Sequence, residues 1–210
     1  ISLDDKFLFS INQKVINSTD KEYDFYSYGQ IIRNKIPEIS NFYILHEGLI
    51  ATLDDELIEE DYDDIQEKKF TRVSQKGWLG IGDKYWITSL IPPRKKEFKT
   101  TFDYKKKFRA NFIATEPLEL KSKGRIEEKL QIIVAAKRVD IIDGYAKSLS
   151  IDKFDLAIDW GFLYWFTKPL FHAIDYFFKL LGNYGLAIIA VTICIRLVFF
   201  PLANFSFRSM

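Results

Sequence analysis

Internal disulfide bonds are excluded by composition, because the 210 residues include one cysteine, Cys194. An excess of one charge sign is also missing. The 30 Lys and Arg residues nearly balance 29 Asp and Glu residues, so no global charge favours a nucleic-acid partner. The first residues, ISLDDKFLFS, lack the basic start, apolar core and cleavage site of a signal peptide, and an initiator methionine. The last residues, FRSM, follow an apolar run directly, so we expect both ends to be cut from a longer protein.

Short strands are predicted throughout residues 1–148. Stretches rich in β-branched and aromatic residues are separated by Gly, Asn, Asp and Pro. They lie at residues 7–17, 22–32, 41–53, 76–91, 109–120 and 128–139. Alternation between the two faces of a strand is clearest over residues 109–114. Many short strands with few helical patterns predict a β-sandwich.

An acidic stretch interrupts this pattern at residues 53–69, LDDELIEEDYDDIQEKK. Carboxylates are suitable ligands for Ca²⁺, but their spacing here lacks the glycine and the ligand order of an EF-hand. We therefore predict a solvated loop, and no metal site.

The densest apolar and aromatic stretch is residues 77–93, which we predict to supply the domain core. The side chains expected there are Trp78, Ile81, Trp86, Ile87 and Leu90. Glycine accepts positive φ, so Gly80–Asp83 is predicted to form a turn or bulge.

Residues 149–182 are predicted to form a connector and an amphipathic helix. The connector turns helical over residues 140–151, and Pro169 is expected to break the following helix, because proline lacks the N–H that a helix interior needs. A polar stripe lies on one helix face and an apolar row on another. The stripe is Lys168, His172, Asp175 and Lys179, and the row is Phe171, Ile174, Phe178 and Leu181.

Two environments suit such a helix: the core of a soluble domain and the surface of a bilayer. Trp160, Tyr164, Trp165 and Tyr176 favour the bilayer, because Trp and Tyr concentrate at the headgroup level. We expect residues 154–181 to lie parallel to the membrane, bent at Pro169, with Phe171, Phe178 and Leu181 buried in lipid or protein.

A transmembrane helix is predicted over residues 183–204. From Tyr184 to Leu202 the chain is apolar for about 19 residues, which span about 28 Å at 1.5 Å per residue, close to the thickness of a hydrocarbon core. The glycines of GNYG, residues 182–185, precede this helix, and Pro201 and Asn204 are expected to end it.

One arginine, Arg196, interrupts the apolar run, and an arginine at membrane depth costs about 2.5–3.5 kcal/mol on insertion scales. Its side chain can extend to the headgroups, or it can face a water-filled cavity between several helices. These two interpretations stay open from physics alone. Thr192 lies four positions earlier and shares the helix face of Arg196, which we expect to be the wet face.

The second half of the chain resembles the YidC/Oxa family of membrane protein insertases. The similar stretches are GWLGIGDKYWITSLIPP (77–93), AAKRVDIIDGY (135–145), FDLAIDWGFLYWFTKPLF (154–171), LGNYGLAIIAVTICIRLVFFPLAN (181–204) and SFRSM (206–210). The match covers residues 41–210 well and residues 1–40 loosely. It implies a mainly β fold: a partial periplasmic β-supersandwich at 1–148, an interfacial helix within 149–182, the second transmembrane helix at 183–204 and the start of a cytoplasmic hairpin at 205–210.

The resemblance also implies a function: an insertase and chaperone that helps nascent membrane proteins insert and fold in the bacterial inner membrane. In bacterial members of the family, the position of Arg196 lines a hydrophilic groove, and the shared helix face adds Thr192 to that predicted site. Residues 1–182 are expected on the periplasmic side of a protein that is multi-pass at full length. The implied partners are nascent membrane proteins, the lipid bilayer, the Sec translocon and the ribosome, with no nucleic acid and no cofactor.

Two other functions compete with this one. A single-pass, membrane-anchored periplasmic binding protein would need no charge in its membrane helix, so Arg196 argues against it. A hydrolase or sugar-processing enzyme could use His46 and Glu47, but this dipeptide lacks the second histidine of a zinc helix and lies in a strand pattern. We therefore predict no catalytic residues.

Overall fold

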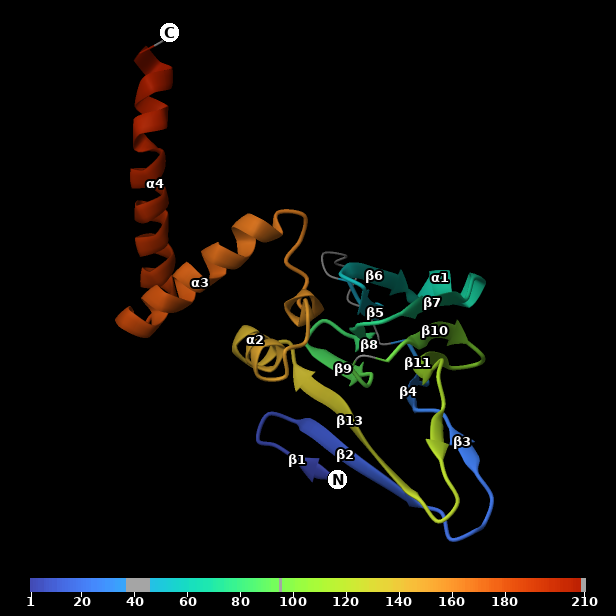
Figure 1. Cartoon of the computed structure of the whole chain (residues 1–210). Coiled ribbons are helices and arrows are strands. Elements are labelled where there is room, and N and C mark those ends of the chain that lie inside the picture. The colour runs from blue at the N-terminus through green and yellow to red at the C-terminus, as the bar shows by residue number, and fades with distance from the viewer. Residues whose placement is uncertain (37–45, 95, 209–210) are drawn as a thin grey trace. The chain divides into compact units, whose positions relative to one another are not determined.

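The computed structural model describes residues 1–36, 46–94 and 96–208, and it divides into two compact units, Ile1–Asp159 and Trp160–Met210. Figure 1 labels most of the elements. The strands are β1 (Ser2–Leu3), β2 (Leu8–Ile16), β3 (Tyr23–Phe25), β4 (Tyr28–Arg33), β5 (Gly48–Leu53), β6 (Glu56–Asp61), β7 (Phe70–Ser74), β8 (Gly77–Gly82), β9 (Trp86–Ile91), β10 (Phe98–Tyr104), β11 (Phe108–Ala114), β12 (Leu118–Leu120) and β13 (Arg125–Ala136). The helices are α1 (Tyr62–Glu67), α2 (Val139–Ser148), the 3₁₀ helix η1 (Phe154–Ala157), α3 (Tyr164–Leu181) and α4 (Tyr184–Arg208).

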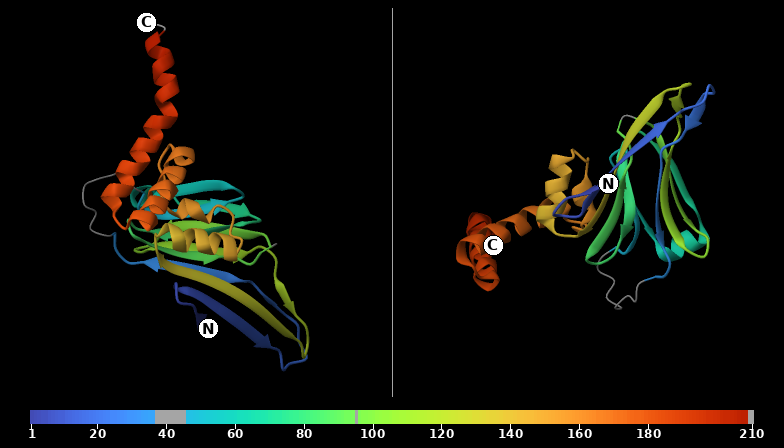
Figure 2. Two further views of the ribbon diagram at one scale, coloured as in Figure 1. Left: turned by 90° about the vertical axis from the view of Figure 1, so that its left-hand side faces the viewer. Right: turned by 90° about the horizontal axis from the view of Figure 1, so that it is seen from below.

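The first unit is built around two antiparallel sheets that face each other (Figure 2, right). The larger sheet has seven strands in the order β1-β2-β13-β9-β8-β5-β6, and the smaller has four in the order β4-β11-β10-β7. Strands β3 and β12 form a separate two-stranded ribbon. The predicted sandwich, and the mainly β fold followed by helices, are confirmed. Of the strand predicted at 41–53, residues 41–45 lie outside the described residues.

Aromatic side chains of the smaller sheet fill the space between the two sheets. Phe98, Phe102, Phe108 and Phe112 are at most 3% exposed, and they pack with leucines of the larger sheet such as Leu79. In β11 the buried residues alternate with more exposed ones, as the sequence predicted. The sandwich core therefore depends on period-two patterning of both inner faces.

A second core lies on the other face of the larger sheet, under α2 and η1. Trp78 is fully buried there, with its ring centroid 5.1 Å from that of Phe154. Ile142 of α2 and Ile133 of β13 are fully buried in the same cluster. The central strands of the larger sheet are covered on both faces, and β5 is therefore buried along its whole length. The helix predicted within residues 140–151 is confirmed as α2.

The acidic stretch at 53–69 is not a loop, contrary to the sequence prediction. Residues Glu56–Asp61 form edge strand β6, paired with β5, and Tyr62–Glu67 form helix α1. Tyr62 and Ile65 are buried by α1, while the carboxylates between them point outward. Two apolar residues one helical turn apart therefore anchor α1 to the core, although the acidic composition of the segment predicted a solvated loop.

The prediction for residues 77–93 is correct for four side chains and wrong for Trp86. Trp78, Ile81, Ile87 and Leu90 are buried, whereas Trp86 is 55% exposed. Trp86 is the first residue of β9, pairs with Ala136 at the end of β13, and follows directly after the β8–β9 turn. Its position at the tip of the hairpin explains the exposure, because the core does not extend that far.

The turn predicted at Gly80–Asp83 is also misplaced. Strand β8 continues to Gly82, and the turn follows it, closed by the Asp83 N–H donating to the Trp86 carbonyl at 2.8 Å. Gly80 is needed because strand β9 approaches its Cα closely, and not because its φ is positive. A Cβ at Gly80 would lie 2.2 Å from the carbonyl oxygen of Thr88 on the neighbouring strand.

Gly80→Ala should therefore destabilise the first unit by about 1–3 kcal/mol, because β8 and β9 would have to move apart. Gly144→Ala is the matched control, since nothing lies within 4 Å of a Cβ at this position in α2. There the exchange should be neutral or stabilising by about 0.5–1 kcal/mol. Urea unfolding of the chain in detergent, followed by circular dichroism, measures both. Equal midpoints for the two variants would contradict the close approach.

The second unit consists of α3 and α4, which differ from prediction at their prolines. Pro169 lies inside α3 and does not break it, and the irregular segment comes earlier, at residues 158–163. Pro201 likewise lies inside α4, which continues to Arg208 and so passes Asn204. The end of the predicted cytoplasmic segment, residues 209–210, lies outside the described residues.

Candidate functional site

Helix α4 has the length and composition to cross a membrane. Its candidate span is Tyr184–Pro201, with a mean hydropathy of 2.1 and 11% of the segment buried inside the chain. Arg196 is the only charged residue of that segment. The site is therefore a single guanidinium on an otherwise apolar, largely uncovered helix.

Helix α3 packs along one side of α4. Ala187 and Val191 are buried at this contact, and the ring of Phe178 stacks on that of Tyr184 with 3.8 Å between centroids. Farther along, the two helices leave an apolar groove of about 370 Å³, lined by Leu170, Ala173 and Phe177 of α3 and by Val191, Cys194 and Val198 of α4.

Arg196 lies on the opposite side of α4 from this contact. It follows Ala187 by nine positions, which is about two and a half turns at 3.6 residues per turn. Its side chain is exposed, and no described residue forms an ion pair with it. Helix α3 therefore does not cover the guanidinium, which is open to the surroundings of α4 on that side.

Thr192 shares the face of Arg196, being one turn away and exposed. Its hydroxyl donates a hydrogen bond to the carbonyl of Ile188 at 2.7 Å, which commits the proton to its own helix. The threonine oxygen keeps lone pairs for an outside donor. The structure therefore brings the two predicted site residues onto one face, with different capacities: Arg196 can donate, and Thr192 can accept.

The polar stripe of α3 lies opposite the side that contacts α4, since Leu170, Ala173 and Phe177 are about half a turn away from it. Within the stripe, the Lys179 ammonium lies 2.6 Å from the Asp175 carboxylate. The Lys168 ammonium lies 5.7 Å from the centre of the Trp160 ring. The apolar row predicted from the sequence is displaced by one residue from the side of α3 that contacts α4. Two of its members, Phe171 and Leu181, are therefore 43% exposed within the chain. Their burial in lipid or protein stays a prediction.

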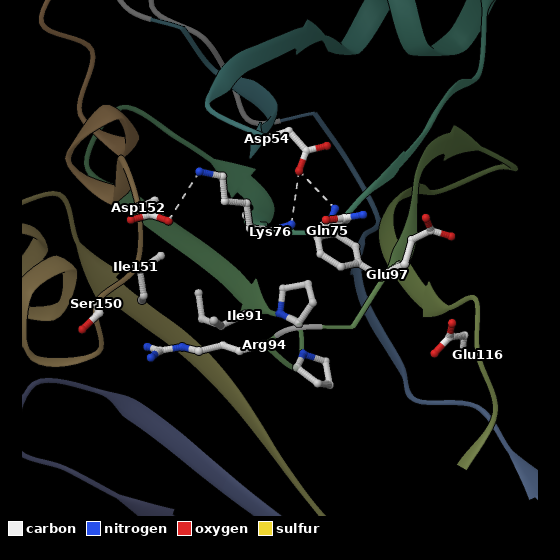
Figure 3. A pocket seen from close by; sticks show the side chains of 14 residues that line it. Asp54, Gln75, Lys76, Ile91, Arg94, Glu97, Glu116, Ser150, Ile151 and Asp152 are labelled. Atoms are coloured by element: carbon white, nitrogen blue, oxygen red, sulfur yellow. Dashed lines mark hydrogen bonds and ion pairs between the residues drawn. The ribbon is translucent and has the colours of Figure 1, made fainter. Parts of the chain in front are cut away.

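A separate cavity of about 670 Å³ lies in the first unit, between the β7–β8 turn, the connection after β9 and the loop after α2 (Figure 3). Three charged groups at or next to its rim, Asp54, Asp55 and Lys76, connect the β5–β6 and β7–β8 turns. The Asp54 carboxylate accepts hydrogen bonds from the N–H groups of Gln75 and Lys76 at 3.0 and 3.3 Å. Lys76 pairs with Asp55 at 2.6 Å, and this contact lowers the pKa of the Asp55 carboxyl and raises that of Lys76. These contacts give Asp54, Asp55 and Lys76 structural roles.

His46 and Glu47, the pair that suggested an enzyme, also make structural contacts. The His46 ring lies 3.2 Å from the Asp61 carboxylate and 3.3 Å from the Leu49 carbonyl. Glu47 accepts a hydrogen bond from the Lys84 N–H at 3.1 Å. Among the residues that the structure describes, no group of three His, Cys, Asp or Glu side chains could hold a metal ion.

Comparisons with known proteins agree with these features. The chain matches the family model of the YidC periplasmic domain over residues 1–173. It is 73% identical over 210 residues to the membrane protein insertase YidC of Pelagibacter ubique (strain HTCC1062), covering all of this chain and 38% of that relative. It is 42% identical over 218 residues to the same-named protein of Rickettsia prowazekii (strain Madrid E), covering 39% of it. The chain thus spans about two fifths of the length of these relatives.

Proposed function

This chain belongs to the YidC family, and from that premise we propose that it forms part of an insertase of the bacterial inner membrane. In this proposal the full-length protein helps nascent membrane proteins insert and fold. The Arg196 face of α4, with Thr192, lines a hydrophilic groove that receives polar parts of the incoming chain. The names of the relatives support the insertase activity, and the groove rests on the geometry of α4.

The observation that carries the groove is the placement of Arg196. A charge facing hydrocarbon is costly, and charged residues within membrane segments usually face a bundle interior or a water-filled cavity. Helix α3 covers the opposite side of α4, at Ala187 and Val191, and so leaves the Arg196 side for other helices of the full-length protein. One helix cannot enclose a groove, so those helices must complete it.

The groove would act through solvation and charge. A wet cavity inside the bilayer lowers the cost of moving a short polar segment across, because that segment need not enter hydrocarbon. The guanidinium attracts acidic side chains of the translocated tail, and Coulomb attraction increases as the effective dielectric falls. No covalent bond is formed or broken in this cycle, so the protein would not be an enzyme.

Residues 1–182 would lie on the periplasmic side, with α3 along the membrane surface. The polar stripe of α3 supports this, because it lies opposite the apolar side that packs on α4. Trp160 and Tyr164 beside Lys168 supply the aromatic and basic groups found at headgroup level. The Sec translocon and the ribosome are further partners that we propose for the full-length protein.

The proposed function is tested by insertion assays on full-length protein with Arg196 replaced. A single-pass, anchored binding protein, the competing proposal, predicts that replacement of Arg196 has no effect on any membrane-protein substrate. Loss of insertion that depends on acidic residues in the substrate would support the groove.

A further inference from the structure

The turn between β8 and β9 carries two exposed aromatic side chains that have no packing role in the first unit. Tyr85 is 65% exposed and Trp86 is 55% exposed. The Lys84 ammonium lies 5.2 Å from the centre of the Tyr85 ring. Tryptophan is usually among the more buried residues, so an exposed Trp beside an exposed Tyr and a Lys calls for a partner.

The turn is held firmly by the rest of the unit. The Asp83 N–H donates to the Trp86 carbonyl at 2.8 Å, and the Lys137 N–H donates to the Tyr85 carbonyl at 2.8 Å. The Asp83 carboxylate forms an ion pair with Arg33 at 2.5 Å. The two rings are therefore presented on a fixed support, and ordering the backbone on binding would cost little free energy.

The turn lies at the end of the first unit where the chain leaves it. Lys84 binds Glu47 through its N–H, and the neighbouring His46 N–H donates to the Asp159 carboxylate at 3.3 Å. Asp159 is the last residue of the first unit, and the next residue opens the unit that contains the membrane span. Tyr85 and Trp86 thus lie at the end of the first unit where the chain passes into the second unit.

We propose that the β8–β9 turn is a second membrane contact, with Tyr85 and Trp86 resting in the headgroup layer beside Lys84. Trp and Tyr prefer this layer because their rings are apolar and their N–H and O–H groups can still be hydrated. A lysine stem lies along apolar surface while its ammonium reaches water or lipid phosphate. The contact would fix the orientation of the periplasmic domain on the membrane, independently of the Arg196 groove.

The opposite end of the first unit offers a matched control. Tyr23 is 44% exposed on β3, close to Lys21, so its surroundings also combine an aromatic ring with a lysine. Strand β13 runs from Arg125, near that end, to Ala136, the partner of Trp86. Eleven steps of about 3.3 Å separate the two ends by about 36 Å.

The experiment uses full-length protein in phospholipid vesicles, with native cysteines replaced by serine. A fluorescent label is attached at Tyr85→Cys or at Tyr23→Cys, and the vesicles contain lipid with a nitroxide on the headgroup. We expect the label at 85 to lose much of its fluorescence and the label at 23 to keep it. Adding Trp86→Ser to a label at Lys84→Cys should restore fluorescence there, because the contact is weakened.

Equal quenching at 85 and 23 would overturn the proposal. So would an unquenched label at 85, whether it faces water or is covered by another part of the protein. Failure of the Arg196 assays would leave this result unaffected, because quenching reports lipid contact and does not require insertion of a substrate.

Discussion

Arg196→Ala in the full-length protein should lower the insertion rate of a substrate with acidic residues in its translocated tail by about tenfold, equivalent to about 1.4 kcal/mol. The loss follows from removing the one positive charge in the span of α4, which would otherwise attract those carboxylates at reduced dielectric. Arg196→Lys should retain much of the rate, because attraction needs a charge more than a fork of donors. The measurement is insertion into proteoliposomes, scored by protease protection.

Two controls separate attraction from other effects. A substrate with its acidic residues replaced by asparagine or glutamine should insert at similar rates with Arg196 and with Ala at that position. Lys179→Ala removes a positive charge outside the span, from an exposed pair with Asp175, and should change neither substrate. If Arg196 only extends to the headgroups, Arg196→Ala will be harmless for both substrates, and the groove proposal fails.

Trp78→Ala should destabilise the first unit by about 3–5 kcal/mol, the range for removing a large buried aromatic side chain. Trp78 is fully buried between the larger sheet and η1, its ring meets Phe154 edge-on, and its indole N–H donates to the Lys153 carbonyl at 3.4 Å. The cavity left behind would loosen η1 and α2 from the sheet. Chemical unfolding in detergent gives the free energy of unfolding.

Trp86→Ala is the matched control, because Trp86 belongs to the same hairpin and is 55% exposed. It should change the free energy of unfolding by less than about 0.5 kcal/mol, as exposed positions usually do. Similar decreases in the free energy of unfolding for the two variants would contradict the difference in burial between Trp78 and Trp86.

The contrast between these tryptophans illustrates what the sequence could predict. Richness in β-branched and aromatic residues identified β2, β4, β5, β8, β9, β11 and β13, and alternation was clear in β11. Neither signal could separate Trp78 from Trp86, since the two differ in their position along the hairpin and not in their local pattern. Exposure at the end of a strand depends on how far the opposite sheet extends, which is a property of the assembled fold.

The sequence prediction missed three elements, β6, α1 and β10, because they lie within or between charged stretches. Strand β10 lies between lysine clusters, and β6 and α1 lie within the acidic stretch, so composition indicated solvent there. In β6 and α1 the buried residues are few, namely Tyr62 and Ile65 of α1, whereas β10 buries Phe98, Thr100, Thr101 and Phe102 between exposed lysines. At the two prolines the sequence predicts helix ends that the structure does not have. Pro169 and Pro201 lie inside continuous helices, because packing and an apolar surrounding can keep a helix continuous through a proline.

The sequence predicts where Thr192 and Arg196 lie on their helix, and their role in a groove stays a proposal. Helical periodicity puts Thr192 and Arg196 on one face, and the structure agrees. The sequence could not indicate which side of α4 is covered by α3, because that depends on how the chain turns at Gly182, where φ is 68°. This reversal directs Ala187 and Val191 toward α3 and leaves Arg196 on the far side.

Water accessibility along α4 tests the central claim most directly. In full-length protein in membranes, with Cys194 replaced by serine, Thr192→Cys and Val191→Cys lie at nearly the same depth but on different sides of α4. Val191 is 5% exposed, against α3, and Thr192 is exposed on the Arg196 face. A membrane-impermeant thiol reagent should modify Cys at 192 and leave Cys at 191 unmodified. Modification of neither position, or of 191 alone, would contradict a wet groove on the Arg196 face.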